Sequence, residues 1–155
     1  ALAADEDAVA MLPQPFVTVA QTQNENIRVA LDMTEEWQKA AEANGEEATL
    51  ITGVVIARND FIAEHPEAVE LFLEQYAASV DYVTSNVSDA AQLVGNYDIV
   101  AAPVAEKAIP YCNITCITGN EMKQKLSSYL TVLAEQNPAA VGGALPEDDF
   151  YYNAD

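Results

Sequence analysis

The sequence predicts a helix-rich α/β fold, because three short strand candidates are followed by a region that contains helices alone. The candidates are residues 8–12, 27–31 and 49–57, which are apolar and partly β-branched, as buried strands are. After Asn59, apolar residues recur at helical spacing. A parallel sheet needs more than three strands to cover its faces, so we expect the remaining strands to lie outside this chain.

Helices are expected between the strand candidates of the first part of the chain. Proline suits the first turn of a helix, so a short helix is predicted after Pro15. Thr34 is a good N-cap for a second helix, and Gly45 suits a left-handed position at the end of that helix. Gly53 lies inside the longest strand candidate and indicates a bulge or a close approach to the backbone.

Helices dominate the second part. Four are predicted, each between a start and a stop signal: from Pro66, from Ser88 to Gly95, from Pro103 to Pro110, and from a capping box at Thr118–Glu121 to Asn137. In the helix from Pro66, apolar residues share one face and acidic residues the opposite face. The tail after Pro138 is expected to be irregular.

Negative charge is the strongest feature of the composition, with 25 acidic against 6 basic residues and a net charge of −19. No Lys or Arg occurs between Arg58 and Lys107. Such a surface repels phosphate backbones and anionic headgroups, so nucleic acid and peripheral membrane are not expected as partners. The coat is interpreted as solubilising, with a specific cation or a basic partner as the alternative.

The ends and hydropathy of the chain suggest a processed protein. No run approaches the roughly 18 apolar residues of a membrane span, and residues 1–7 lack the basic region of a signal peptide. The chain begins without Met, so we expect a processed protein or a cut one.

No residue pattern indicates catalysis, a metal or a cofactor. Cys112 and Cys116 stand in a context that favours extended chain, where this spacing separates them by about 13 Å, too far for a disulfide. A helical context would make a bridge feasible; two buried, inert thiols are the expectation. His65 is the sole histidine and has no nominated partner, so neither zinc nor base catalysis is predicted.

Three segments in chain order resemble one protein family. They are DAVAMLPQPF at 7–16, with a Pro-Gln-Pro-Phe turn after a small-residue strand; TGVVIARNDFIAEHPE at 52–67; and Asn137-Pro138 with VGGALP and FYY at 141–152. Together they are similar to the NitT/TauT family of solute-binding proteins, which includes the sulfonate-, taurine- and thiamine-precursor-binding proteins. The last segment resembles a clostridial branch.

The resemblance implies a partial type II periplasmic-binding fold, in which two α/β lobes are joined by crossover strands. Residues 1–49 would then be part of the second lobe, residues 50–57 a crossover strand, and residues 58–155 the C-terminal helices of the first lobe. About half of a family member, at its N-terminal side, would be absent.

The function that the resemblance implies is extracytoplasmic capture of a small solute for a bacterial ABC importer, by closure of two lobes. The protein would be periplasmic or lipid-anchored at the cell surface. Its solute would belong to the nitrate, sulfonate or pyrimidine-like class, and its protein partners would be the ABC permease subunits.

Six residues are predicted to contact the solute, from a turn at a strand end and from the crossover: Pro13, Gln14, Pro15, Phe16, Thr52 and Gly53. The plain alternatives are a rigid turn with Phe16 packed inside, and a Gly53 that only permits a bend. Family members often carry Glu at the position of Gln14, so the charge preference of this site is expected to differ.

Two other function classes stay open. One is a thiamine-pyrimidine-synthase-like enzyme of the same fold family, although Cys112-x3-Cys116 does not match its Cys-rich motif. The other is a helical interaction domain. If the chain is a fragment, we expect it to bind no solute appreciably by itself, and to self-associate through open strand edges at Ala8–Leu12 or Leu50–Ala57.

The charge predicts that added sodium chloride raises the melting temperature. Like charges on one small protein repel each other, and salt at about 0.15 M screens charges more than about 8 Å apart. Thermal melts at several salt concentrations and one low protein concentration measure the effect. A midpoint that is flat or falls with salt contradicts the prediction.

Overall fold

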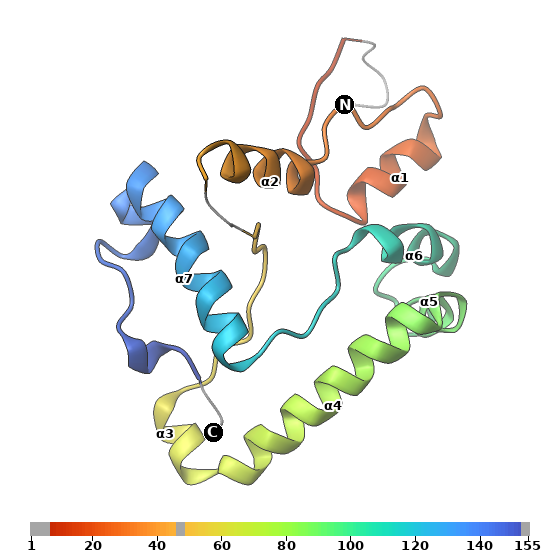
Figure 1. The fold of residues 1–155 in the computed structure, drawn as a ribbon. Helices are drawn as coiled ribbons and strands as arrows, with labels where there is room; N and C mark the ends of the chain where they lie inside the picture. Colours follow the sequence, from red (N-terminus) through yellow and green to blue (C-terminus); the bar gives the residue numbers. More distant parts are fainter. Residues whose placement is uncertain (1–6, 46–48, 153–155) are drawn as a thin grey trace. The chain divides into compact units, whose positions relative to one another are not determined.

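A computed structural model describes residues 7–45 and 49–152, and every regular element in these ranges is a helix (Figure 1). The elements are α1 (Phe16–Gln23), α2 (Met33–Ala43), α3 (Asn59–Glu64), α4 (Pro66–Ser85), α5 (Val87–Asn96), α6 (Ala102–Ala108), η2 (Ile109–Tyr111), α7 (Gly119–Gln136), η3 (Pro138–Val141) and η4 (Asp148–Phe150). Residues 1–6, part of the N-terminal stretch that lacks the basic region of a signal peptide, lie outside the described residues.

The predicted α/β fold is wrong, and with it the partial type II periplasmic-binding fold. No strand occurs among residues 7–45 and 49–152. The three segments predicted as strands, 8–12, 27–31 and 49–57, are irregular. The physical reason is that an extended segment pairs its backbone only with a neighbouring strand. These segments find no such neighbour in the described chain.

The helices follow the predicted start and stop signals closely. The helices after Pro15 and from Pro66 are confirmed, as is the helix that ends before Asn137. Two details differ. The N-cap of α2 is Asp32, because its carboxylate accepts hydrogen bonds from the backbone N–H groups of Thr34 (2.8 Å) and Glu35 (3.4 Å).

Two further caps differ from the sequence prediction. Helix α5 begins at Val87, and its N-cap Asn86 lies two residues before the predicted cap Ser88. Helix α7 begins after Thr118 as predicted, but Thr118 makes no side-chain capping hydrogen bond. The start of this helix is therefore right, and the capping-box hydrogen bond is absent.

The chain forms two compact units. The first comprises the chain up to Val29 together with Arg58–Cys116, and the second comprises Ala30–Ala57 and the chain from Ile117 onward. The predicted division into 1–49, 50–57 and 58–155 concerned the lobes of a larger protein and stays a prediction.

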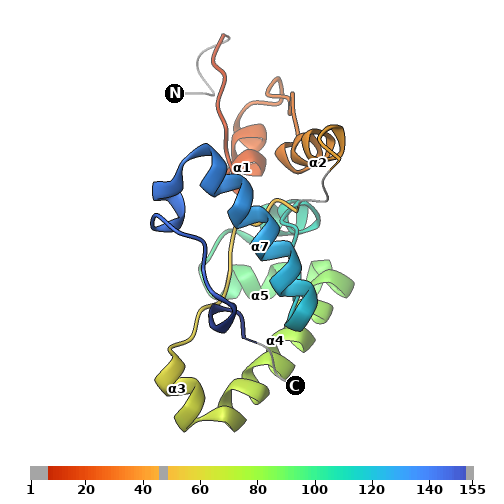
Figure 2. The ribbon, with the colours of Figure 1, turned by 60° about the vertical axis from the view of Figure 1, so that its left-hand side comes forward.

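The core of the first unit is small and lies where α5, α6 and η2 meet. Its buried residues are Ala90, Ala91, Ala105 and Ile109, and valines of the surrounding segments pack against them. The long helix α4 runs between α3 and α5 (Figures 1 and 2). The small alanine side chains let the backbones of α5 and α6 approach closely, because nothing larger stands between them.

Gly95 contributes to the same close approach. A Cβ atom at this position would lie 3.0 Å from the Cβ of Ala102 and 3.1 Å from its backbone nitrogen. The predicted role of Gly95 as the stop of the helix is only approximate, since α5 continues to Asn96. Its larger role is packing against the first residue of α6.

The second unit is organised around α7. Leu126 on this helix is buried, and the Tyr129 ring lies 5.3 Å from the Trp37 ring of α2, in a tilted arrangement. Near the start of α7, Lys123 forms an ion pair with Asp148 of the C-terminal tail at 2.9 Å. The Lys123 ammonium also lies 5.9 Å from the centre of the Tyr151 ring. The indole nitrogen of Trp37 is buried without a hydrogen-bond partner.

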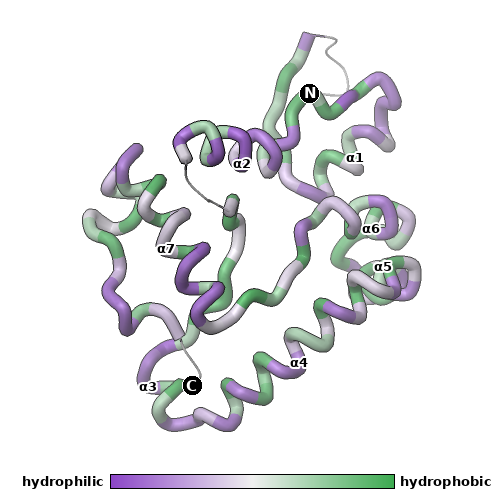
Figure 3. The backbone as a smooth tube through the Cα atoms, in the orientation of Figure 1, coloured by the Kyte–Doolittle hydropathy of each residue, from purple (hydrophilic) through white to green (hydrophobic). Residues whose placement is uncertain are grey.

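Many large apolar side chains remain in water. Hydrophobic residues continue along the irregular stretch that leads into α3 and along α4 (Figure 3). The side chains of Val9, Met11 and Ile56 are 97%, 81% and 79% exposed. Each large apolar side chain left in water forgoes about 1.5–3 kcal/mol of burial free energy, so these surfaces favour a covering partner.

The Ala91→Leu substitution is expected to destabilise the first unit. Ala91 is 0% exposed within the α5–α6 contact, and extra methylene groups in a packed core cost about 1–3 kcal/mol. Urea unfolding, followed by the helical circular dichroism signal, measures the change in free energy. The matched control is Gln92→Leu, at an exposed neighbour on the same helix; equal effects of the two substitutions would contradict the assigned core.

Candidate functional site

The predicted Pro-Gln-Pro-Phe turn forms the entry to α1. The side-chain oxygen of Gln14 accepts hydrogen bonds from the hydroxyl of Thr18 (2.8 Å) and from its backbone N–H (3.4 Å). Thr18 is buried, with 6% of its surface exposed. Gln14 thus accepts a hydrogen bond from one of the backbone N–H groups that the first turn of α1 leaves without a partner in the helix, as a capping residue does.

The orientation of the Gln14 amide follows from this contact. A backbone N–H can only donate, so the amide oxygen must face Thr18 and the amide NH2 group must point elsewhere. No described residue accepts a hydrogen bond from this NH2 group, and it is left to donate to another partner. The turn therefore presents an N–H donor whose hydrogen bonds the oxygens of a solute can accept.

Phe16 follows Gln14 by two residues and is the first residue of α1. Its side chain is 59% exposed, so the alternative in which the ring is packed inside does not describe this structure. Pro13 is exposed and Pro15 is half-buried. The turn thus gathers an exposed aromatic ring and an amide donor, which together suit stacking and hydrogen bonding to a small polar molecule.

Thr52 and Gly53 lie in the second unit, in the irregular segment before α3, and both are exposed. An added Cβ at Gly53 would meet no atom within 4 Å, so the predicted close approach to the backbone is not present. No element of regular structure fixes the Thr52 hydroxyl. This pair belongs to a different unit from the turn at Gln14.

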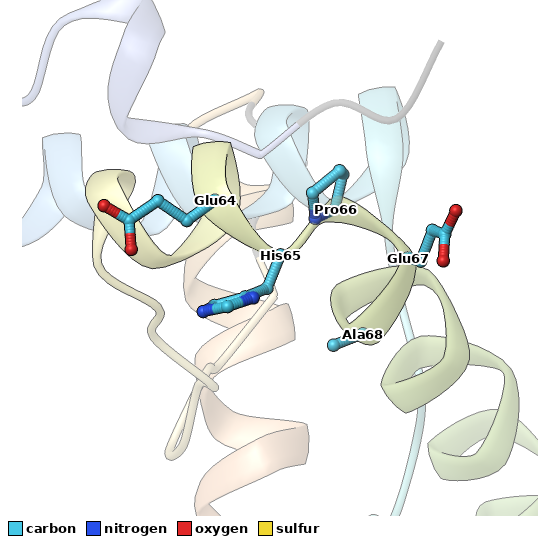
Figure 4. A pocket seen from close by; sticks show the side chains of 5 residues that line it. All are labelled: Glu64, His65, Pro66, Glu67 and Ala68. Carbon is cyan, nitrogen blue, oxygen red and sulfur yellow. The ribbon is translucent and has the colours of Figure 1, made fainter.

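A shallow depression surrounds His65, between α3 and α4 (Figure 4). Its wall consists of Glu64, His65, Pro66, Glu67 and Ala68, all exposed. The carboxylates of Glu64 and Glu67 point away from each other (Figure 4). The centre of the imidazole lies 4.9 Å from that of the Phe61 ring, in a tilted arrangement, and none of the described hydrogen bonds reaches the imidazole. The arrangement is a helix-to-helix turn, without the convergent groups of a catalytic site.

A second depression lies over the core of the first unit. It is lined by Thr84, Val87, Ile109, Pro110, Asn113 and Ile114. The Thr84 hydroxyl in this lining already donates a hydrogen bond to the Val80 carbonyl, at 2.9 Å. The lining is otherwise mostly apolar and provides few groups that would orient a polar solute.

Both cysteines are free and half-buried, and they lie outside regular helices. The Cys112 thiol donates to the carbonyl of Ala108 at 3.2 Å. Burial raises the pKa of the Cys112 thiol above its ordinary value. The thiol is therefore protonated near neutral pH, which lowers its nucleophilicity.

Within residues 7–45 and 49–152, no group of three or more His, Cys, Asp or Glu side chains is placed to hold a metal ion. The same part of the chain contains no helix of the length and apolarity that a membrane crossing requires. Comparison with protein-family models, with curated proteins and with solved structures finds no match to this chain.

The raised pKa predicts slow alkylation of Cys112. In the Cys116→Ser variant, reaction with iodoacetamide at neutral pH should be slower than that of an unstructured cysteine peptide. The rate should keep rising at a pH where the peptide rate has levelled off, because the thiolate forms later. In denaturant the two rates should converge; equal rates under native conditions would contradict the burial.

Proposed function

We propose that this chain is part of the extracytoplasmic solute-binding component of a bacterial ABC importer and supplies one wall of its solute site. One observation carries the proposal: two of the segments that resemble the solute-binding family are irregular and leave apolar side chains uncovered. Val9 and Met11 are exposed in the first segment, and Val54, Val55 and Ile56 in the second.

Exposed apolar segments of this kind support the proposal that the chain functions as part of a larger protein. Their side chains would be stabilised by burial against further polypeptide of the same protein. The core that the chain builds for itself is limited to small residues such as Ala90 and Ala91, with Ile109 as the largest member of the cluster. A solute site enclosed from several sides would likewise need walls from that further polypeptide.

The turn at Gln14 is the part of the proposed wall whose chemistry is best defined. The NH2 group of Gln14 has no hydrogen-bond acceptor among the described residues, and the ring of Phe16 is exposed. An amide donor suits the oxygens of a nitrate or a sulfonate, and an aromatic ring suits a planar solute such as a pyrimidine. Thr52 and Gly53 lie in the second unit, and their predicted solute contacts, through a hydroxyl and through backbone groups, stay a separate prediction.

A helical interaction domain is the second candidate, favoured by the absence of strands in the described residues. Helix α4 carries an exposed apolar surface that includes Leu71, Phe72 and Tyr76. The Phe72 and Tyr76 rings are stacked, with 5.7 Å between their centres. This class predicts binding of a protein and no response to small solutes.

Solute binding is tested with the complete gene product that contains these residues. Nitrate, alkanesulfonates and pyrimidines are titrated by calorimetry, and one class is expected to bind. Gln14→Glu keeps the oxygen that Thr18 contacts but replaces the NH2 donor by a negative charge. For an anionic solute, binding should weaken by about tenfold or more, since one hydrogen bond and a repulsion are involved.

Thr18→Val provides the matched control, because it removes the hydroxyl that donates to Gln14 while leaving the NH2 group in place. Its effect on solute affinity should be small. Equal losses in both variants would mean that Gln14 acts only on the start of α1. Absence of binding by any solute class in the complete protein would contradict the proposed function and favour the interaction domain.

A further inference from the structure

Helix α4 exposes an apolar face, formed by Leu71, Phe72, Tyr76 and Tyr82. These side chains are 52%, 44%, 37% and 43% exposed, in that order. Within the first unit, α4 contacts α3 and α5, which adjoin its two ends, and η2 (Figure 1). None of the described elements of this unit therefore packs over the middle turns of α4.

A row of carboxylates borders the apolar face. This acidic row consists of Glu67, Glu70, Glu74 and Asp81, all exposed and all on α4. Glu67 and Glu74 lie four residues before and three residues after Leu71, so they neighbour Leu71 on the helix surface. In the part of the chain that the structure describes, no ion pair involves any of the four carboxylates.

The sequence supplies no positive charge near the acidic row. Nine acidic residues and no Lys or Arg occur between Arg58 and Lys107. Glu70 and Glu74 stand four residues apart, a spacing at which like charges on a helix repel each other. A partner with Lys or Arg side chains would relieve this repulsion, whereas a second copy of the chain would add acidic groups to it. The charge therefore selects a basic partner.

The apolar face continues toward the depression that lies over the core of the first unit. Tyr76, Val80 and Thr84 follow one another at four-residue spacing, so they are neighbours along the helix. Thr84 also lines the depression, together with the apolar side chains of Val87 and Ile109. The depression has a volume of about 270 Å³. A cavity of roughly 150 Å³ holds a benzene-sized group, so an apolar side chain of a partner fits here.

We propose that α4 binds a basic amphipathic helix of another protein. Apolar side chains of the partner lie on the apolar face, with one of them in the depression, and its Lys or Arg side chains face the acidic row. The partner is a helix because the backbone of α4 is already hydrogen-bonded within itself and offers no edge to an added strand. Phe72 and Thr84 are about 18 Å apart along the helix axis, which a partner helix of about 14 residues spans.

This inference goes beyond the proposed function, because it concerns a protein partner of α4 and no solute. It also goes beyond a helical interaction domain in general, since the acidic row and the apolar face together specify the chemistry of the partner. Its measurement contains no solute, so its outcome is separate from that of the solute titrations.

The test uses the complete gene product and a labelled 14-residue peptide of Leu and Lys, with the leucines at helical spacing on one face. Fluorescence anisotropy is expected to show binding that weakens as sodium chloride is added, because salt screens the charge contacts. A peptide of the same composition in scrambled order should bind at least about tenfold more weakly, since its leucines share no face. Absence of binding by the patterned peptide, or equal binding of the two peptides, would overturn the proposal.

Two variants separate the surface of α4 from the charge of the whole protein. Replacing Glu67, Glu70 and Glu74 by Gln should weaken binding about tenfold, as the loss of several exposed charge contacts does. The matched control replaces Asp89 and Asp98 by Asn and Glu106 by Gln, which removes the same charge from exposed positions outside α4. Equal losses in the two triple variants would show a general attraction of cations and overturn the proposal.

The apolar face has its own pair of variants. Phe72→Ser should weaken binding about tenfold or more, because exposed aromatic side chains dominate many protein interfaces. Tyr97→Ser is the matched control, since Tyr97 is 76% exposed and follows α5. The helical circular dichroism signal verifies folding of every variant. Full affinity in Phe72→Ser, or the same loss in Tyr97→Ser, would contradict the assigned face.

Discussion

An extended segment depends on a neighbour for its backbone hydrogen bonds, whereas a helix forms them within itself. This constraint separates the regular from the irregular parts of the protein. Segments with helical spacing of apolar residues form helices, as in α4 and α7. Segments with strand-like composition, above all 49–57, are irregular because no partner strand lies within the described residues. The exposed apolar side chains of these segments, such as Val55 and Ile56, follow from the same lack of a partner.

The helices that do form are held by modest contacts. In the first unit, Ala90, Ala91 and Ala105 let α5 and α6 approach, and Gly95 leaves room for Ala102. In the second unit, the contact of Trp37 with Tyr129 joins α2 to α7. Small side chains give a close fit but bury little apolar area each, so the free energy gained per residue is limited. Both units would gain stability from further apolar contacts.

The proposed solute site is consistent with this division of roles. The turn at Gln14 has a defined geometry because α1 follows it directly and Thr18 orients the amide. Thr52 and Gly53 lie in the irregular segment, where no hydrogen bond of the described backbone fixes them. Of the proposed contacts, the turn at Gln14 is therefore the one whose geometry is preorganised.

The sequence by itself determined the helices, their approximate ends and the charge of the surface. Pro15, Pro66 and Asn137 act through local backbone geometry, and their effects were predicted correctly. The tertiary structure decided what depends on distant neighbours: that the three strand candidates lack pairing, that Phe16 is exposed, and that Gly53 is uncrowded. The orientation of Gln14, in contrast, is set locally, by Thr18 four residues away. Local signals fix helices because helical hydrogen bonds are local, whereas strands and binding sites require partners that composition does not supply.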